Sequence, residues 1–166
     1  CVCNLVFVID QSTKKMFSIR FTILSITTIL VVVATTSYAY VPCTNPSKHV
    51  GHWIGRNQEC AALVQTNCHR QPGNKQIGLT SSWRRGVHVK DNCSKIPAYT
   101  AIATFLGPNH HYDEPHLHQH TAIFVRCEKA GIRVYDQWNG TPIGFRIIPW
   151  KGSSQQYSGN NFYTVA

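Results

Sequence analysis

The chain has 166 residues, of which 43% are hydrophobic and 14% are charged, and it carries a formal net charge of +9. This length corresponds to one domain and excludes a second catalytic domain of full size. The apolar content, which includes 7 Phe, 4 Trp and 7 Tyr, excludes a disordered or fibrous chain. The excess of positive charge favours an anionic partner, which could be a nucleic acid, an acidic membrane surface or a wall polymer.

The N-terminal segment predicts secretion. We expect residues 1–15 to be a non-native upstream extension, because the chain's single methionine follows them. Residues 16–39 have the organisation of a signal peptide, with Arg20 in a short basic region, an apolar run over 21–35, and small residues before a cleavage site. The apolar run is too short and too interrupted for a stable membrane anchor. We therefore expect one secreted domain, extracellular or periplasmic, over residues 40–166.

This expected domain contains an odd number of cysteines. They are Cys43, Cys60, Cys68, Cys93 and Cys127. Cysteines of exported proteins tend to pair, so one thiol should remain. If Cys60 is the free one, the other four can form two disulfides in any of three pairings. The odd count is the first indication of a nucleophile.

Residues 59–69 predict a helix. Apolar and cysteine residues recur there at offsets of three, four and eight, which is one helical face: Cys60, Leu63, Val64 and Cys68. Pro72 and Gly73 should terminate the helix. Cys60 then lies in the first turn, where the helix N-terminus and a nearby histidine can lower the pKa of a thiol.

Four short runs of β-branched and aromatic residues predict an antiparallel meander. They cover residues 99–106, 121–127, 132–138 and 143–150, and a hairpin connection over 128–131 joins the second to the third. The preceding helix should cover one apolar face of this sheet. The predicted fold class is α+β.

The second and third runs bring a histidine close to a polar partner. His120 opens the second run, and Asp136 and Gln137 stand near the end of the third. The register decides which of them shares the histidine's face. Pairing Phe124 with Asp136 selects the acid, whereas pairing Phe124 with Tyr135 selects Gln137. We prefer Asp136, because a carboxylate also stabilises an imidazolium.

These segments together resemble the papain-fold amidases of the NlpC/P60 and CHAP type, and most closely the small secreted or injected peptidoglycan amidases. The resemblance covers about residues 49–150. It is carried by ECAALVQ at 59–65, Trp83 with Gly86, TAIATF at 100–105, HTAI at 120–123 and VYDQW at 134–138. It implies a papain-like fold and hydrolysis of amide bonds in peptidoglycan stem peptides.

By the same resemblance, Cys60 is the nucleophile, His120 the base and Asp136 the orienting residue. Gln58 is the candidate for a second oxyanion donor, and Gln137 is the alternative orienting residue. No cofactor is implied, and the enzyme is expected to act as a monomer.

Two tryptophans are candidate substrate contacts. Trp83 stands beside the basic pair Arg84 and Arg85, and Trp138 follows the predicted orienting residue. The basic residues could bind an anionic glycan or could be scattered surface charge. No nucleic-acid partner is expected, because the chain has no basic run of five or more and no recognisable binding motif.

Two alternatives to a cysteine hydrolase remain open at the level of sequence. If extended, the segment with His116, His118 and His120 places three imidazoles on one face, as in a catalytic zinc site. A metal-dependent hydrolase or a metal-binding protein would use that set. The other alternative is a non-enzymatic, disulfide-rich binding or defence protein, in which Cys60 should be oxidised.

Overall fold

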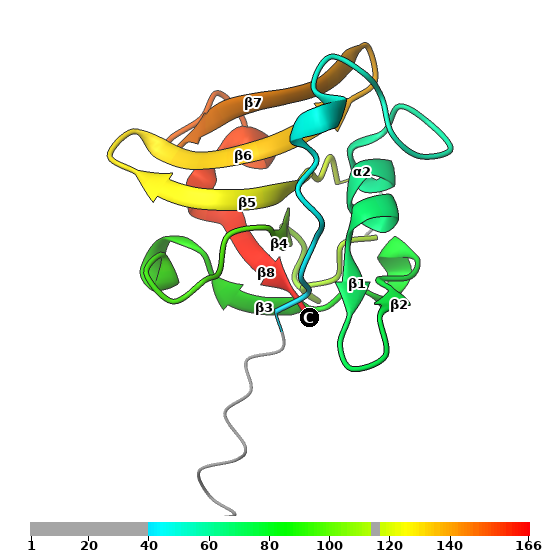
Figure 1. The fold of residues 1–166 in the computed structure, drawn as a ribbon. Coiled ribbons are helices and arrows are strands. Elements are labelled where there is room, and N and C mark those ends of the chain that lie inside the picture. The colour runs from blue at the N-terminus through cyan, green and yellow to red at the C-terminus, as the bar shows by residue number, and fades with distance from the viewer. Residues whose placement is uncertain (1–39, 114–116) are drawn as a thin grey trace, which may run out of the picture. The chain divides into compact units, whose positions relative to one another are not determined.

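A six-stranded antiparallel sheet forms the centre of the computed structural model, which describes residues 40–113 and 117–166 (Figure 1). The strand order is β3-β8-β4-β5-β6-β7. The strands are β3 Arg85–His88, β4 Thr100–Thr104, β5 Thr121–Glu128, β6 Gly131–Trp138, β7 Thr141–Pro149 and β8 Phe162–Val165. The predicted upstream extension and signal peptide lie outside the described residues. None of the helices in the described ranges is long and apolar enough to cross a membrane.

The four predicted strands are confirmed as β4 to β7, which pair consecutively as an antiparallel meander. Strands β3 and β8 were not predicted. Each is only four residues long, and β3 contains Gly86 and two basic side chains, so neither has a clear alternation of apolar and polar residues. They form because β8 pairs with both β4 and β3.

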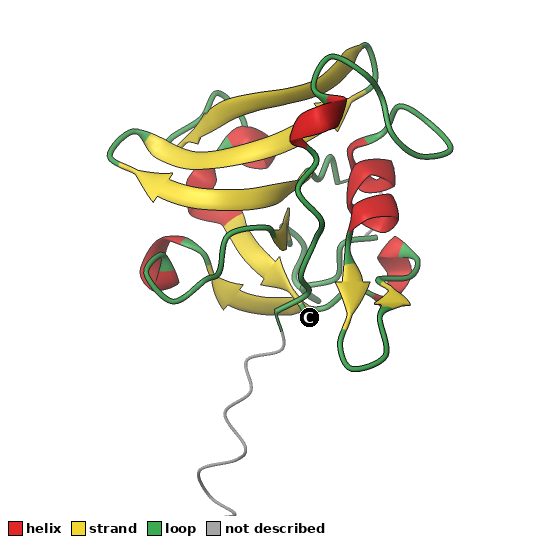
Figure 2. Cartoon of the chain, viewed as in Figure 1, coloured by secondary structure: helices red, strands yellow, loops and turns green. Residues whose placement is uncertain are grey.

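The helix α2 (Cys60–Asn67) starts one residue after the predicted start, with Cys60 in its first turn as predicted, and ends two residues before the predicted end. Cys68 is extended there, because it forms a bridge and a disulfide with Cys43. The other elements are short. They are β1 His69–Arg70, β2 Lys75–Gln76, η1 Ser47–His49, η2 Thr80–Ser82, η3 Lys90–Asn92, η4 Gln155–Tyr157 and η5 Gly159–Asn161 (Figure 2).

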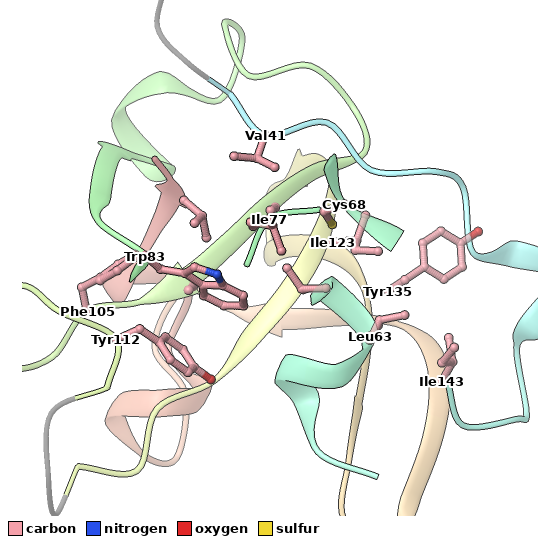
Figure 3. Packing of buried hydrophobic residues seen from close by; sticks show 14 residues of the cluster. Val41, Leu63, Cys68, Ile77, Trp83, Phe105, Tyr112, Ile123, Tyr135 and Ile143 are labelled. Atoms are coloured by element: carbon pink, nitrogen blue, oxygen red, sulfur yellow. The ribbon is translucent and has the colours of Figure 1, made fainter. Parts of the chain in front are cut away.

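The sheet has an apolar cluster on each face. Helix α2 contributes Leu63 and Val64 to the first cluster, where they pack with Ile123 of β5 and Tyr135 of β6 (Figure 3). The second cluster contains Ile102, Phe124 and Val134 from the opposite face, covered by Val89 and Ile96. Since α2 covers the first face, the expected helix-on-sheet packing is confirmed.

Two disulfides tie loops to this framework. Cys43 pairs with Cys68 at the end of α2, and Cys93 pairs with Cys127 in β5. Cys60 is free. Of the three pairings that the sequence left open, the structure contains this one, and the oxidised Cys60 expected for a non-enzymatic protein is absent.

The β5–β6 and β6–β7 hairpins each contain a bulge, and these bulges set the register. Between β5 and β6 the pairing begins as Glu128 with Gly131, and it shifts at Val125 so that Phe124 faces Val134. Both registers predicted from sequence were wrong, because neither included an extra residue in β5. Without the bulge, Gln137 would share the face of His120. With it, Asp136 does.

Candidate active site

Cys60 is the first residue of α2 and is 8% exposed. The helix packs against β5, so its N-terminal end brings the thiol to the start of that strand, where Thr121 and His120 lie. His120 and the backbone N–H of Thr121 lie close enough to the Cys60 side chain to lower the pKa of its thiol. The predicted approach of the helix to the histidine-bearing strand is therefore present.

His120 and Asp136 form a buried pair. The His120 Nε2 atom lies 2.7 Å from Asp136 Oδ2, and the two side chains are 3% and 0% exposed. Because Nε2 is engaged by the carboxylate, Nδ1 is the ring nitrogen left to exchange a proton with a thiol. The backbone N–H of His120 donates to Thr104 Oγ1 over 3.0 Å, which fixes the start of β5 against β4.

The thiol and the imidazole shift each other's pKa in opposite directions. Burial alone would raise the pKa of Cys60, but the neighbouring His120, together with the Tyr112 hydroxyl and the Thr121 N–H, outweighs it, so the pKa is lowered from the ordinary value. Burial alone would lower the pKa of His120, but the bonds to Asp136 and Cys60 raise it to about 9. These directions favour a thiolate beside an imidazolium near neutral pH.

Arg146 of β7 holds the other side of the Asp136 carboxylate, and the sequence analysis missed it. Its Nε donates to both oxygens over 2.9 and 3.0 Å, and its Nη2 donates to Oδ2 over 2.5 Å. The guanidinium lies 4.8 Å from the ring centroid of Trp138 and 5.7 Å from that of Tyr157. The carboxylate is thereby fixed between a cation and the imidazole.

A bulge in the second hairpin explains why Arg146 was missed. The Asn139-Gly140 turn pairs Trp138 with Thr141, and a regular ladder from that turn would place Arg146 on the face opposite to Asp136. An extra residue in β7 shifts the register so that Asp136 pairs with Gly144. Pro142 lies within this irregular stretch, and a proline inside a strand is the one local signal that could have indicated a bulge.

Tyr112 was also missed as a site residue. It belongs to the histidine-rich loop between β4 and β5, and its hydroxyl oxygen lies 3.3 Å from Cys60 Sγ. The ring is buried against Trp83 and Phe105, at centroid distances of 5.1 and 6.3 Å (Figure 3). Burial, followed by the charge of Cys60, raises the pKa of Tyr112 well above its ordinary value, so the phenol keeps its proton.

Gln137 has a different role from the alternative one predicted for it. Its side chain is fully buried and binds the loop that leads into α2, accepting from the N–H of Ile54 and donating to the carbonyls of Ile54 and Glu59. Gly55 within this loop has φ +93°, and a Cβ there would lie 2.6 Å from the Cβ of Ala62. The loop thus approaches α2 closely and is held to β6 through one amide.

The remaining predicted contacts have different outcomes. Trp83 is fully buried and donates to the Gly78 carbonyl over 3.2 Å, so its predicted substrate contact is wrong, because the ring fills the core. Trp138 is half-buried at 6.1 Å from the His120 ring and stays a candidate. Gln58 is exposed on the loop before α2, where its role as an oxyanion donor stays a prediction.

The predicted histidine cluster is only partly described. His116 lies outside the described residues, His118 is exposed, and His120 is buried with Asp136. Across residues 40–113 and 117–166, no group of three or more His, Cys, Asp or Glu side chains is arranged to hold a metal ion.

Comparison with known proteins gives this arrangement a family context. The family model "Domesticated amidase effector 2" matches residues 30–165. The chain belongs to the domesticated amidase effector 2 family. A relative of that name from Ixodes scapularis is 43% identical over 128 residues, which is 75% of this chain and 84% of the relative. The membership agrees with the amidase class indicated by the sequence resemblance.

Two bacterial amidase effectors extend the similarity of this domesticated amidase effector 2 member. The type VI secretion amidase effector 2 protein of Salmonella typhi is 32% identical over 85 residues, covering 51% of this chain and 56% of its own length. The solved structure of type 6 secretion amidase effector 2 (Tae2) matches with a TM-score of 0.52 at 20% identity, covering 78% and 88% of the two chains. This structural match supports the fold, which is dominated by antiparallel strands with one α-helix in the described residues.

Proposed function

We propose that this member of the domesticated amidase effector 2 family is a secreted cysteine amidase that hydrolyses amide bonds in peptidoglycan stem peptides. The observation that carries the proposal is the buried His120–Asp136 hydrogen bond beside the free thiol of Cys60, whose pKa His120 lowers. A nucleophile next to a base that an acid holds in place is the arrangement that nucleophilic acyl transfer requires. The same order of elements supports a papain-like fold of the NlpC/P60 or CHAP type.

In the acylation step, the Cys60 thiolate attacks the amide carbonyl carbon and forms a tetrahedral intermediate. The His120 imidazolium then transfers its proton to the amine nitrogen as the carbon–nitrogen bond breaks, which leaves a thioester. Asp136 orients the imidazole and stabilises its charged form throughout. In the second step, His120 takes a proton from water, the hydroxide attacks the thioester, and the thiolate leaves as the carboxylic acid product forms.

The oxyanion of the intermediate requires donors close to Cys60. The N–H groups in the first turn of a helix have no acceptor within the helix, so the Cys60 backbone N–H is available as one donor. Gln58 is the proposed second donor. Trp138, which lies edge-on to the His120 ring, is proposed to limit access of water to the pair and to contact substrate.

The compartment follows from the cysteine chemistry. Two disulfides beside a free thiol fit an oxidising environment, such as the extracellular space or a periplasm. The names of the relatives describe amidase effectors. Peptidoglycan is a glycan whose stem peptides carry carboxylates, and such an anionic polymer suits a basic chain. We therefore propose peptidoglycan, outside the cytoplasm, as the substrate.

The decisive experiment compares Cys60→Ala and His120→Ala with the parent on purified cell walls and on soluble stem peptides. Both variants should lose amidase activity by at least about 10³-fold, because removal of a nucleophile or base leaves only binding and the oxyanion site. Chromatography of released fragments and mass spectrometry identify the bond that is cut.

His118→Ala is the matched control, since His118 is an exposed histidine of the same loop. It should retain the parental rate. Wall hydrolysis by Cys60→Ala at the parental rate would exclude the cysteine mechanism. A parent that cleaves no amide bond in walls or stem peptides would exclude the proposed substrate.

A further inference from the structure

An open hollow of about 260 Å³ lies at the end of β4. It is lined by residues from β3, β8, the loop after β4 and the η4–η5 segment: Arg85, Phe105, Leu106, Gly107, His110, Gln155, Asn161 and Tyr163. This volume is smaller than the roughly 300–1,000 Å³ of sites that enclose a whole drug-sized ligand. The hollow therefore fits one end or one side chain of a larger molecule.

Two lining residues of the hollow, Phe105 and Leu106, contact residues that lie next to Cys60 and His120. Phe105 packs edge-on against Tyr112, whose hydroxyl lies 3.3 Å from Cys60 Sγ (Figure 3). The Leu106 N–H donates to the Gln119 side chain over 3.1 Å, and Gln119 immediately precedes the catalytic histidine in the chain. The hollow is therefore separated from the thiol by one layer of side chains, within the span of a stem peptide bound at Cys60.

Among the residues that the structure describes, the lining of the hollow carries a positive charge and no acidic side chain. Arg85 places its guanidinium 4.8 Å from the ring centroid of Tyr163 and forms no ion pair within residues 40–113 and 117–166. None of its lining residues is acidic, and Asn161 and His110 add polar groups. A guanidinium placed over an aromatic ring can still direct its N–H donors toward a planar anion.

Arg85 differs in this respect from the adjacent Arg84. The Arg84 Nη1 atom donates to the carbonyls of Ser81 and Trp83 over 2.9 and 3.0 Å, and Arg84 does not line the hollow. Of the basic pair that stands out in the sequence, only the second member therefore faces the hollow with its donors available.

We propose that the hollow is a substrate subsite in which Arg85 binds a free carboxylate of the peptide. The proposal rests on the proposed function and specifies the chemical class of the group beyond the scissile bond. An arginine guanidinium can bind a carboxylate through two parallel hydrogen bonds. Stem peptides carry free carboxylates that could form this pair. Asn161 and His110 are placed to contact the same group from the other walls.

The test uses two stem peptides that differ only in one group, a free carboxylate in the first and a carboxamide in the second. The ratio of kcat/KM between them should be about 10 to 100 for the parent, because a hydrogen-bonded charge is lost with the carboxamide. In Arg85→Gln the ratio should approach 1, and in Arg85→Lys it should lie between. Arg84→Gln, the matched control, should keep the parental ratio.

A second readout separates binding from chemistry. Calorimetric titration of Cys60→Ala with the two peptides should show the same preference, and Cys60→Ala/Arg85→Gln should lose it. The subsite would be overturned if the parent had a ratio near 1 whichever carboxylate of the stem peptide is replaced by a carboxamide. An unchanged ratio in Arg85→Gln would also overturn it, and either result would leave the amidase proposal intact. Failure of the parent to cleave either peptide would instead count against the proposed function.

Discussion

At the residue scale, the chemistry of Cys60 depends on three partners rather than on the helix alone. His120 contributes the largest lowering of the thiol pKa, and the Tyr112 hydroxyl and the Thr121 N–H add to it. Tyr112 keeps its proton because its own pKa is raised well above the ordinary value. It therefore serves as a hydrogen-bond donor to the thiolate over the pH range in which the thiolate forms.

Substitution of Tyr112 by Phe tests this contribution. Tyr112→Phe keeps the ring contacts with Trp83 and Phe105 but removes a donor to the thiolate, so the Cys60 pKa should rise. The midpoint of the pH profile for alkylation of Cys60 by iodoacetamide should move to higher pH, and kcat/KM at neutral pH should fall roughly 10-fold.

Tyr99→Phe is the control for this experiment, because Tyr99 packs against the same apolar cluster without contacting the thiol. It should leave the alkylation midpoint where it is in the parent. An unchanged midpoint in Tyr112→Phe would mean that the phenol only fills space.

At the element scale, strand β6 organises the site through two consecutive side chains that point to opposite faces. Asp136 is hydrogen-bonded to His120, and Gln137 holds the Ile54–Glu59 loop that leads into α2. The alternation of a β-strand makes this division possible. One strand thus positions the imidazole from one face and the entrance of the nucleophile's helix from the other.

Substitution of Gln137 by Met should loosen that entrance. Met fills similar volume without the amide and leaves the N–H of Ile54 and the carbonyls of Ile54 and Glu59 without this partner. The free energy of unfolding should fall by about 2 kcal/mol. The backbone amides of residues 54–59 should exchange faster with deuterium. The amidase activity of the variant should also be lower than that of the parent.

Gln76→Met provides the comparison for this variant, since Gln76 is exposed in β2. It should change the unfolding free energy by less than about 0.5 kcal/mol. If Gln137→Met left both stability and exchange unchanged, the loop would be held by other contacts.

At the scale of the whole molecule, the two disulfides act at different distances from the site. The Cys43–Cys68 bond lies at the end of the helix that carries Cys60. The Cys93–Cys127 bond joins the η3 loop to the end of β5 that is remote from His120. Both restrict the unfolded chain, but only the first is adjacent to the helix that carries Cys60.

Removal of the second disulfide should therefore separate stability from activity. Cys93→Ser/Cys127→Ser opens a loop with a sequence separation of 34, and it should lower the free energy of unfolding by about 3 to 4 kcal/mol. Denaturant titration measures the loss. At temperatures where the variant is folded, kcat/KM should stay within about twofold of the parent. A loss below about 1 kcal/mol would show that the loop is ordered without the bond.

The sequence alone determined the elements whose signals are local. Four runs of β-branched and aromatic residues predicted β4 to β7, the helical spacing predicted α2 with Cys60 in its first turn, and the odd cysteine count predicted a free thiol. The pairing of His120 with Asp136 was preferred for a chemical reason, and the structure brings these two residues together.

Only the tertiary structure decided what depends on register and on contacts distant in sequence. A bulge at Val125 selects Asp136 over Gln137, and a second bulge in β7 brings Arg146 to the same carboxylate. One inserted residue reverses which face a side chain occupies, and composition does not reveal the insertion. Tyr112 reaches Cys60 across 52 positions of sequence through loop packing that no periodic pattern encodes.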